Sequence, residues 1–92
     1  MASTALGFVE TRGNTGSVQA IDAMIKTAGV EFVKKVEIGG SYVTSIVRGE
    51  VGAVKSAIEA GAEAAAKVGE LLTVNVIQSA HEDVFGLMGL KK

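Results

Sequence analysis

The alternation of β-rich and helical segments, separated by glycine, most restricts how this chain can fold. Runs rich in β-branched residues predict strands, and apolar residues spaced three or four apart predict helices. The pattern predicts a strand at 5–12, a helix at 17–28, strands at 30–38 and 42–48, a helix at 51–68 and a strand at 71–77. This is the order of split βαβ domains, which are related to the ferredoxin-like fold. We therefore expect an α+β domain whose four-stranded antiparallel sheet carries both helices on one face.

The helix at 51–68 has the clearest pattern in the chain. Its apolar stripe consists of Val51, Val54, Ile58, Gly61, Ala65 and Val68. Charged residues lie away from this stripe, as in a helix that covers a sheet. After the last strand, Val84, Leu87 and Met88 predict a short C-terminal helix within 80–90.

Glycine and small polar residues are expected to end these elements. Gly13 closes the first strand, and Asn14 or Thr15 is expected to cap the first helix. Gly29 is expected to end that helix, and Gly49 is expected to break the third strand.

The segment Gly39-Gly40-Ser41 separates the two middle strands. Consecutive backbone N–H groups with little side chain around them can bind an anion. A tight hairpin turn that needs positive φ accounts for the same residues, and we favour this interpretation.

The length and composition indicate one domain that buries apolar surface in an assembly. With 92 residues the chain has material for a single core, and we expect one domain over 1–92, with a core at 4–81 and a tail at 82–92. It is 48% hydrophobic with a mean hydropathy of +0.38, which is apolar for so small a domain. We expect part of this apolar surface to lie between subunits.

Several partner classes are not expected. No apolar run reaches membrane-spanning length, and no signal-peptide pattern follows Met1. The net charge of −1 offers no general attraction to nucleic acid or anionic lipid. Together with the absence of cysteine, these features predict a cytoplasmic protein that binds neither membrane nor nucleic acid.

The residues needed for catalysis are nearly absent. The chain has no cysteine, and its carboxylates lie mostly on predicted helix surfaces. His81 is the only histidine; we interpret it as surface or interface packing in preference to a titrating switch or a weak metal ligand. The sequence predicts no enzyme, no cofactor and no metal site.

Several motifs in register carry a resemblance to a known family. They are ALGFVETRG at 5–13, DAMIK at 22–26, IGG at 38–40, VTSIVRGEV at 43–51, AGA at 60–62 and VGE at 68–70. In this order, without gaps from Ala5 to His81, they resemble the hexameric shell proteins of bacterial microcompartments. The similar proteins include shell proteins of propanediol utilisation, ethanolamine utilisation and carboxysomes.

The resemblance implies a flat cyclic hexamer that tiles edge to edge with other hexamers into a protein shell around enzymes. It implies a central pore for small polar metabolites, lined by Glu37, Ile38, Gly39, Gly40 and Ser41. Expected partners are further copies, other shell proteins, and encapsulated enzymes or their targeting peptides.

The resemblance also places Lys26 and Ser79 at the hexamer edge. Lys26 is expected to donate hydrogen bonds to backbone carbonyls of the adjacent tile, a role that we favour over simple interaction with the helix dipole. At Ser79 this chain has QSAH at 78–81 where the family typically has Pro-Arg-Pro-His. A serine offers one hydroxyl where arginine offers a planar fork of donors, so weaker tiling of an intact hexamer is expected.

A second departure concerns the pore. Many relatives carry lysine where this chain has Glu37, so weaker passage of anionic metabolites is expected. Alternatively, Glu37 points away from the pore and pairs with Lys34 or Lys35. Some relatives hold an iron–sulfur cluster on a pore cysteine, which this cysteine-free chain cannot do.

Two further functions remain open from the sequence. One is an oligomeric regulatory domain of split βαβ fold that senses a small molecule, which would need a polar pocket between subunits. The other is an independent enzyme, which the missing catalytic groups disfavour. The glycine-rich turn and the lysine on a flat edge favour the shell subunit.

Overall fold

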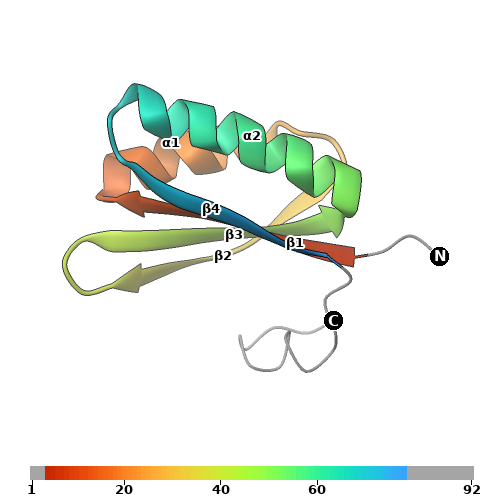
Figure 1. Ribbon diagram of the computed structural model, residues 1–92, viewed down its shortest axis with the longest axis horizontal. Helices are drawn as coiled ribbons and strands as arrows, with labels where there is room; N and C mark the ends of the chain where they lie inside the picture. The colour runs from red at the N-terminus through yellow and green to blue at the C-terminus, as the bar shows by residue number, and fades with distance from the viewer. Residues whose placement is uncertain (1–3, 79–92) are drawn as a thin grey trace.

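A computed structural model describes residues 4–78, which form one sheet with two helices on one of its faces (Figure 1). The elements are β1 (Thr4–Arg12), α1 (Asn14–Ile25), β2 (Val30–Ile38), β3 (Tyr42–Glu50), α2 (Val51–Lys67) and β4 (Leu71–Gln78). The predicted α+β class and the predicted order of elements are confirmed. The predicted helix at 80–90 and the predicted boundary near 81 lie outside the described residues.

The sheet is antiparallel throughout, with strand order β2-β3-β1-β4. β2 and β4 are therefore the two edge strands. The ladder between β2 and β3 shifts register between Phe32 and Lys34, and the ladder between β1 and β4 shifts between Glu10 and Thr11. Such bulges bend a strand and redirect its side chains.

The main core lies between the helices and the central strands. Because side chains alternate along a strand, every second residue of β1 faces the helices, beginning with Ala5. The buried cluster comprises Ala5, Val9, Ala20, Met24, Val47, Val54, Ala57, Ile58 and Ala65. The apolar stripe predicted for the helix at 51–68 supplies Val54, Ile58 and Ala65 to this cluster.

Two glycines allow the helices to pack closely. A Cβ atom on Gly7 of β1 would lie 2.7 Å from side-chain atoms of Val54 and Ile58, and one on Gly61 of α2 would lie 2.7 Å from Cγ of Met24. Larger residues would push α2 away from the sheet and from α1. Gly7 thus sets the spacing between α2 and the sheet, and Gly61 sets the spacing between the two helices.

The start of α1 differs from the sequence prediction. The helix begins at Asn14 and its N-cap residue is Gly13, so the prediction that Asn14 or Thr15 caps it is wrong. The cap comes from a distant residue, because the carboxylate of Glu70 accepts a hydrogen bond from the backbone N–H of Gly16. The side-chain carbonyl of Asn14 instead accepts a hydrogen bond from Lys35, at 3.1 Å.

The predicted roles of Gly29 and Gly49 also need correction. α1 ends at Ile25 with Lys26 as its C-cap, and Gly29 lies in the following turn with φ of 87°. Gly49 does not break β3, which continues to Glu50. A Cβ atom there would lie 2.2 Å from the carbonyl oxygen of Gly29, so glycine is needed where β2 begins to pair with β3.

Across residues 4–78, the helices are too short or too polar to cross a lipid bilayer.

Candidate functional site

The β2–β3 hairpin forms one end of the molecule (Figure 1). Gly40 and Ser41 have φ values of 81° and 69°, as the tight-turn interpretation requires. Ser41 is the only non-glycine residue with positive φ among residues 4–78. A serine held in this conformation is strained, and such strain is typical of functional loops.

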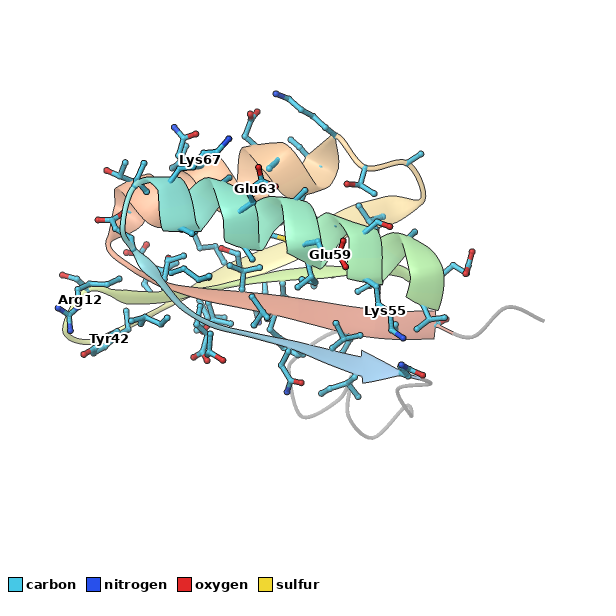
Figure 2. The ribbon with its side chains drawn as sticks, turned by 45° about the horizontal axis from the view of Figure 1, so that its top comes forward. Arg12, Tyr42, Lys55, Glu59, Glu63 and Lys67 are labelled. Carbon is cyan, nitrogen blue, oxygen red and sulfur yellow. The ribbon has the colours of Figure 1, made fainter. Side chains whose placement is uncertain are left out.

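The end of β1 anchors this hairpin. The backbone N–H of Gly13 donates a hydrogen bond to the carbonyl oxygen of Ser41. Directly opposite each other in the ladder, Arg12 and Tyr42 also interact through their side chains, which Figure 2 labels. The Arg12 guanidinium lies 5.7 Å from the centre of the Tyr42 ring and donates to its hydroxyl at 3.4 Å. This pair could not be identified from the sequence, because nothing in the sequence shows which residues face each other.

The predicted pore residues gather at the hairpin. Glu37 is exposed near the end of β2, and Gly39, Gly40 and Ser41 are exposed in the turn. The backbone of Ile38 pairs with Tyr42. The structure therefore brings all five positions to one end of the sheet.

The alternative role of Glu37, an ion pair with Lys34 or Lys35, is not among the ion pairs within residues 4–78. The ion pairs among residues 4–78 join Asp22 to Lys26, Glu31 to Arg48, and Glu63 to Lys67. Lys35 donates to Asn14 of α1 instead of pairing with Glu37.

Lys26 follows the C-terminal end of α1, whereas Gly13, which anchors the hairpin, precedes its N-terminal end. Its side chain is 73% exposed and its ammonium group is 3.0 Å from the carboxylate of Asp22. The pair spans one helical turn and leaves the lysine reachable from outside. Ser79 and His81, the other residues singled out in this region of the sequence, lie outside the described residues.

An open groove runs between the outer surfaces of α1 and α2, with a volume of about 430 Å³. It is lined by small side chains such as Ala23, Ala60 and Ala64 and by the Lys26–Asp22 and Lys67–Glu63 ion pairs. No three histidine, cysteine, aspartate or glutamate side chains within 4–78 gather as a metal site would require.

Large apolar side chains are exposed on the flanks of the single chain. They are Val18 and Ile25 of α1, Phe32 and Val36 of β2, Tyr42 of β3, Val68, and Leu72 and Val74 of β4. The four on β2 and β4 occupy the two edge strands of the sheet. Edge strands of this kind offer both unpaired backbone groups and apolar surface to another molecule.

Comparison with known proteins finds relatives over nearly the whole chain. The bacterial microcompartment shell protein PduA of Citrobacter freundii is 54% identical over 84 residues, which cover 91% of this chain and 90% of that protein. The bacterial microcompartment shell protein EutM of Escherichia coli is 49% identical over 95% of this chain and 92% of that protein. The carboxysome shell protein CsoS1B of Hydrogenovibrio crunogenus is 44% identical over 96% of this chain and 92% of that protein.

A solved structure shares the fold. The crystal structure of a microcompartments protein from Desulfitobacterium hafniense superposes with a TM-score of 0.84 at 24% identity. The match covers 97% of this chain and 49% of that chain, so the present chain spans about half of that protein.

These relatives help to choose between a shell subunit, a regulatory domain and an enzyme, the functions that the sequence left open. The relatives are named as shell proteins and not as enzymes or regulators, which confirms the resemblance and the prediction of a non-enzymatic protein. Residues 5–80 match the BMC domain. The chain therefore belongs to the BMC-domain family of bacterial microcompartment shell proteins.

Proposed function

We propose that this protein is a structural shell subunit that forms cyclic hexamers, which tile edge to edge into the shell of a microcompartment in the bacterial cytoplasm. The observation that carries the proposal is the 54% identity to a shell protein along 91% of the chain. The nearly empty set of catalytic residues agrees with a structural role.

The exposed apolar flanks support a ring. Phe32 and Val36 lie on one edge of the sheet, and Leu72 and Val74 lie on the other. In a head-to-tail cyclic oligomer, one surface of each subunit contacts a different surface of the next subunit. The ring closes when the rotation from one subunit to the next divides a full turn into equal steps. Two unlike apolar flanks on opposite edges fit this requirement.

The β2–β3 hairpin is the proposed wall of the central pore. The pore-lining positions are Glu37, Ile38, Gly39, Gly40 and Ser41. Exposed glycines leave the backbone N–H groups open, and the Ser41 hydroxyl adds a polar group that small polar metabolites can contact as they pass. The anchoring of Ser41 by Gly13 supports a wall of fixed width.

Lys26 is the proposed contact between neighbouring hexamers, with Ser79 in place of the arginine typical of the family. The exposed ammonium group of Lys26 can exchange Asp22 for carbonyl oxygens of an adjacent tile at little cost, since an exposed pair of this kind contributes about 0.3–0.5 kcal/mol. Other shell proteins, encapsulated enzymes and their targeting peptides are the further proposed partners.

Electron microscopy of concentrated purified protein tests the tiling. We expect flat sheets or tubes with a hexagonal lattice. Discrete rings without a lattice would locate a defect at the edge, at Ser79, whereas the absence of both rings and lattice would contradict the proposal.

A further inference from the structure

Arg12 lies beside the turn of the β2–β3 hairpin, on the sheet face that the helices leave uncovered. Its neighbour Thr11 is fully buried on the helix-covered face, and alternation along β1 turns Arg12 to the other face. Arg12 is exposed and pairs with Tyr42 in the ladder. Figure 2 shows both side chains together at the hairpin end of the molecule.

Glu37 lies at the same end but on the opposite face. It pairs with Val43, which pairs in turn with Thr11, and both of these partners are buried against the helices. Lys35, two residues before Glu37, confirms the orientation by reaching Asn14 at the start of α1. Each face carries a second charge two residues further from the turn. Glu10 shares the face of Arg12 and accepts a hydrogen bond from Thr44. Lys35 shares the face of Glu37. The charge nearest the turn is therefore a cation on one face and an anion on the other.

We propose that the pore has mouths of opposite charge. Arg12 and its symmetry copies form a cationic ring at the sheet-side mouth, which gathers small carboxylates, while Glu37 and its copies form an anionic ring at the helix-side mouth. This inference rests on the proposed hexamer with the hairpin at its axis. It goes beyond that function by naming the residue that selects charge at each entrance.

The contacts of Arg12 make it suited to this role. Its guanidinium is held over the Tyr42 ring at 5.7 Å and hydrogen-bonds the ring hydroxyl, which restricts its position. None of the ion pairs within residues 4–78 includes Arg12. A guanidinium presents a planar set of donors that matches a carboxylate. Several such groups around one opening raise the local concentration of anions more than any one alone.

Tyr42 provides a direct readout, because the chain has one tyrosine and no tryptophan. Intrinsic fluorescence therefore reports on the immediate surroundings of Arg12. Quenching by iodide measures the local anion concentration, and quenching by neutral acrylamide measures access alone. The ratio of the two quenching constants, at fixed ionic strength and on protein whose hexameric mass has been verified, isolates the effect of charge.

We expect Arg12→Gln to lower the iodide-to-acrylamide ratio about twofold or more, the size expected for loss of one cation within about 6 Å in water. Arg12→Lys should keep most of the ratio because it keeps the charge. Lys55→Gln is the matched control. It removes one exposed cation near the start of α2, at the end of the molecule away from Arg12 and Tyr42 (Figure 2). An unchanged ratio in Arg12→Gln would overturn the proposal.

A second measurement separates a ring from a single surface arginine. Replacing chloride by millimolar citrate at constant ionic strength should protect Tyr42 of the wild type from iodide, because several guanidinium groups hold a tricarboxylate that one cannot. Absence of protection would refute the ring. A protein that is not a hexamer would instead refute the proposed function, so the two failures are distinguishable.

Discussion

The carboxylate of Glu70 accepts a hydrogen bond from the backbone N–H of Gly16, across 54 positions of sequence. It thereby caps the N-terminus of α1 from the turn between α2 and β4. The backbone carbonyl of the same residue accepts a hydrogen bond from the N–H of Arg12, at 2.9 Å. Glu70 thus joins the end of β1, the start of α1 and the start of β4.

Removal of this carboxylate should destabilise the fold. We expect Glu70→Ala to lower the free energy of unfolding by about 0.5–2 kcal/mol, because a helix N-terminus loses both a hydrogen-bond acceptor and a favourable negative charge. Urea unfolding at matched protein concentration measures the change. Glu59→Ala, at an exposed position of α2, is the control. Equal stability of the two variants would rule out a capping role.

Two fully buried serines should respond differently to the same substitution by alanine. The Ser17 hydroxyl donates to the carbonyl oxygen of Asn14 at 3.1 Å, whereas the Ser45 hydroxyl has no hydrogen-bond partner in the described structure. A buried polar group without a partner is unfavourable. We expect Ser17→Ala to cost about 0.5–1.5 kcal/mol and Ser45→Ala to be neutral or stabilising. Thermal unfolding of both variants checks this, and a marked loss in Ser45→Ala would contradict it.

Gly49 should not tolerate a side chain. A Cβ atom would collide with the Gly29 carbonyl, so Gly49→Ala must push β2 away from β3 and is expected to cost about 1–3 kcal/mol. In Gly52→Ala, the control, the nearest atom is a carboxylate oxygen of Glu50, at 3.3 Å, which lies at the end of a long side chain and caps α2 through the Gly52 N–H. That variant should be neutral or stabilising, since alanine favours a helix. Urea unfolding of both variants decides the point; similar midpoints would be the contrary result.

Lys26 should matter for tiling and not for the ring. Lys67 is a close match, because its side chain is 74% exposed and lies 3.6 Å from the carboxylate of Glu63, one turn earlier. We expect Lys26→Ala to abolish sheets in electron micrographs without changing the mass in solution, and Lys67→Ala to keep them. Loss of sheets in both variants would point to general surface charge.

The same assay tests the serine at the edge. Ser79→Arg should extend the lattice, because arginine offers more donors than serine. An arginine variant that assembles no better than the wild type would contradict a weakened edge.

Glu37 should reduce the passage of anions. In the proposed hexamer, six Glu37 carboxylates near a narrow opening would repel anions. Glu37→Gln should therefore raise the flux of a small anion through assembled shells, and added salt should diminish the difference. Flux of a neutral solute of similar size serves as the control. Equal anion flux through the wild type and the variant would refute a field at the pore.

The order and type of the elements could be predicted because they depend on local patterns. The stripe that begins at Val51 and the β-branched runs on either side of Gly39-Gly40 fix which segments are helices and strands. The turn at Gly40 was likewise predictable, because glycine at this position favours positive φ.

The features that sequence reasoning missed depend on contacts between distant residues. The cap of α1 comes from Glu70 and not from the adjacent Asn14, and Gly49 is required by the approach of the Gly29 backbone. The face on which Glu37 lies depends on the ladder register, which a bulge in β2 shifts. None of these relationships leaves a local pattern that could be read before the fold is known.

The mass of the purified protein in solution, measured by light scattering, tests the central claim most directly. We expect a single species of six times the 9.4 kDa chain mass, stable on dilution, because the proposed ring would bury the apolar side chains that are exposed on both edge strands of the single chain. A monomer or a trimer would contradict the proposed shell tile.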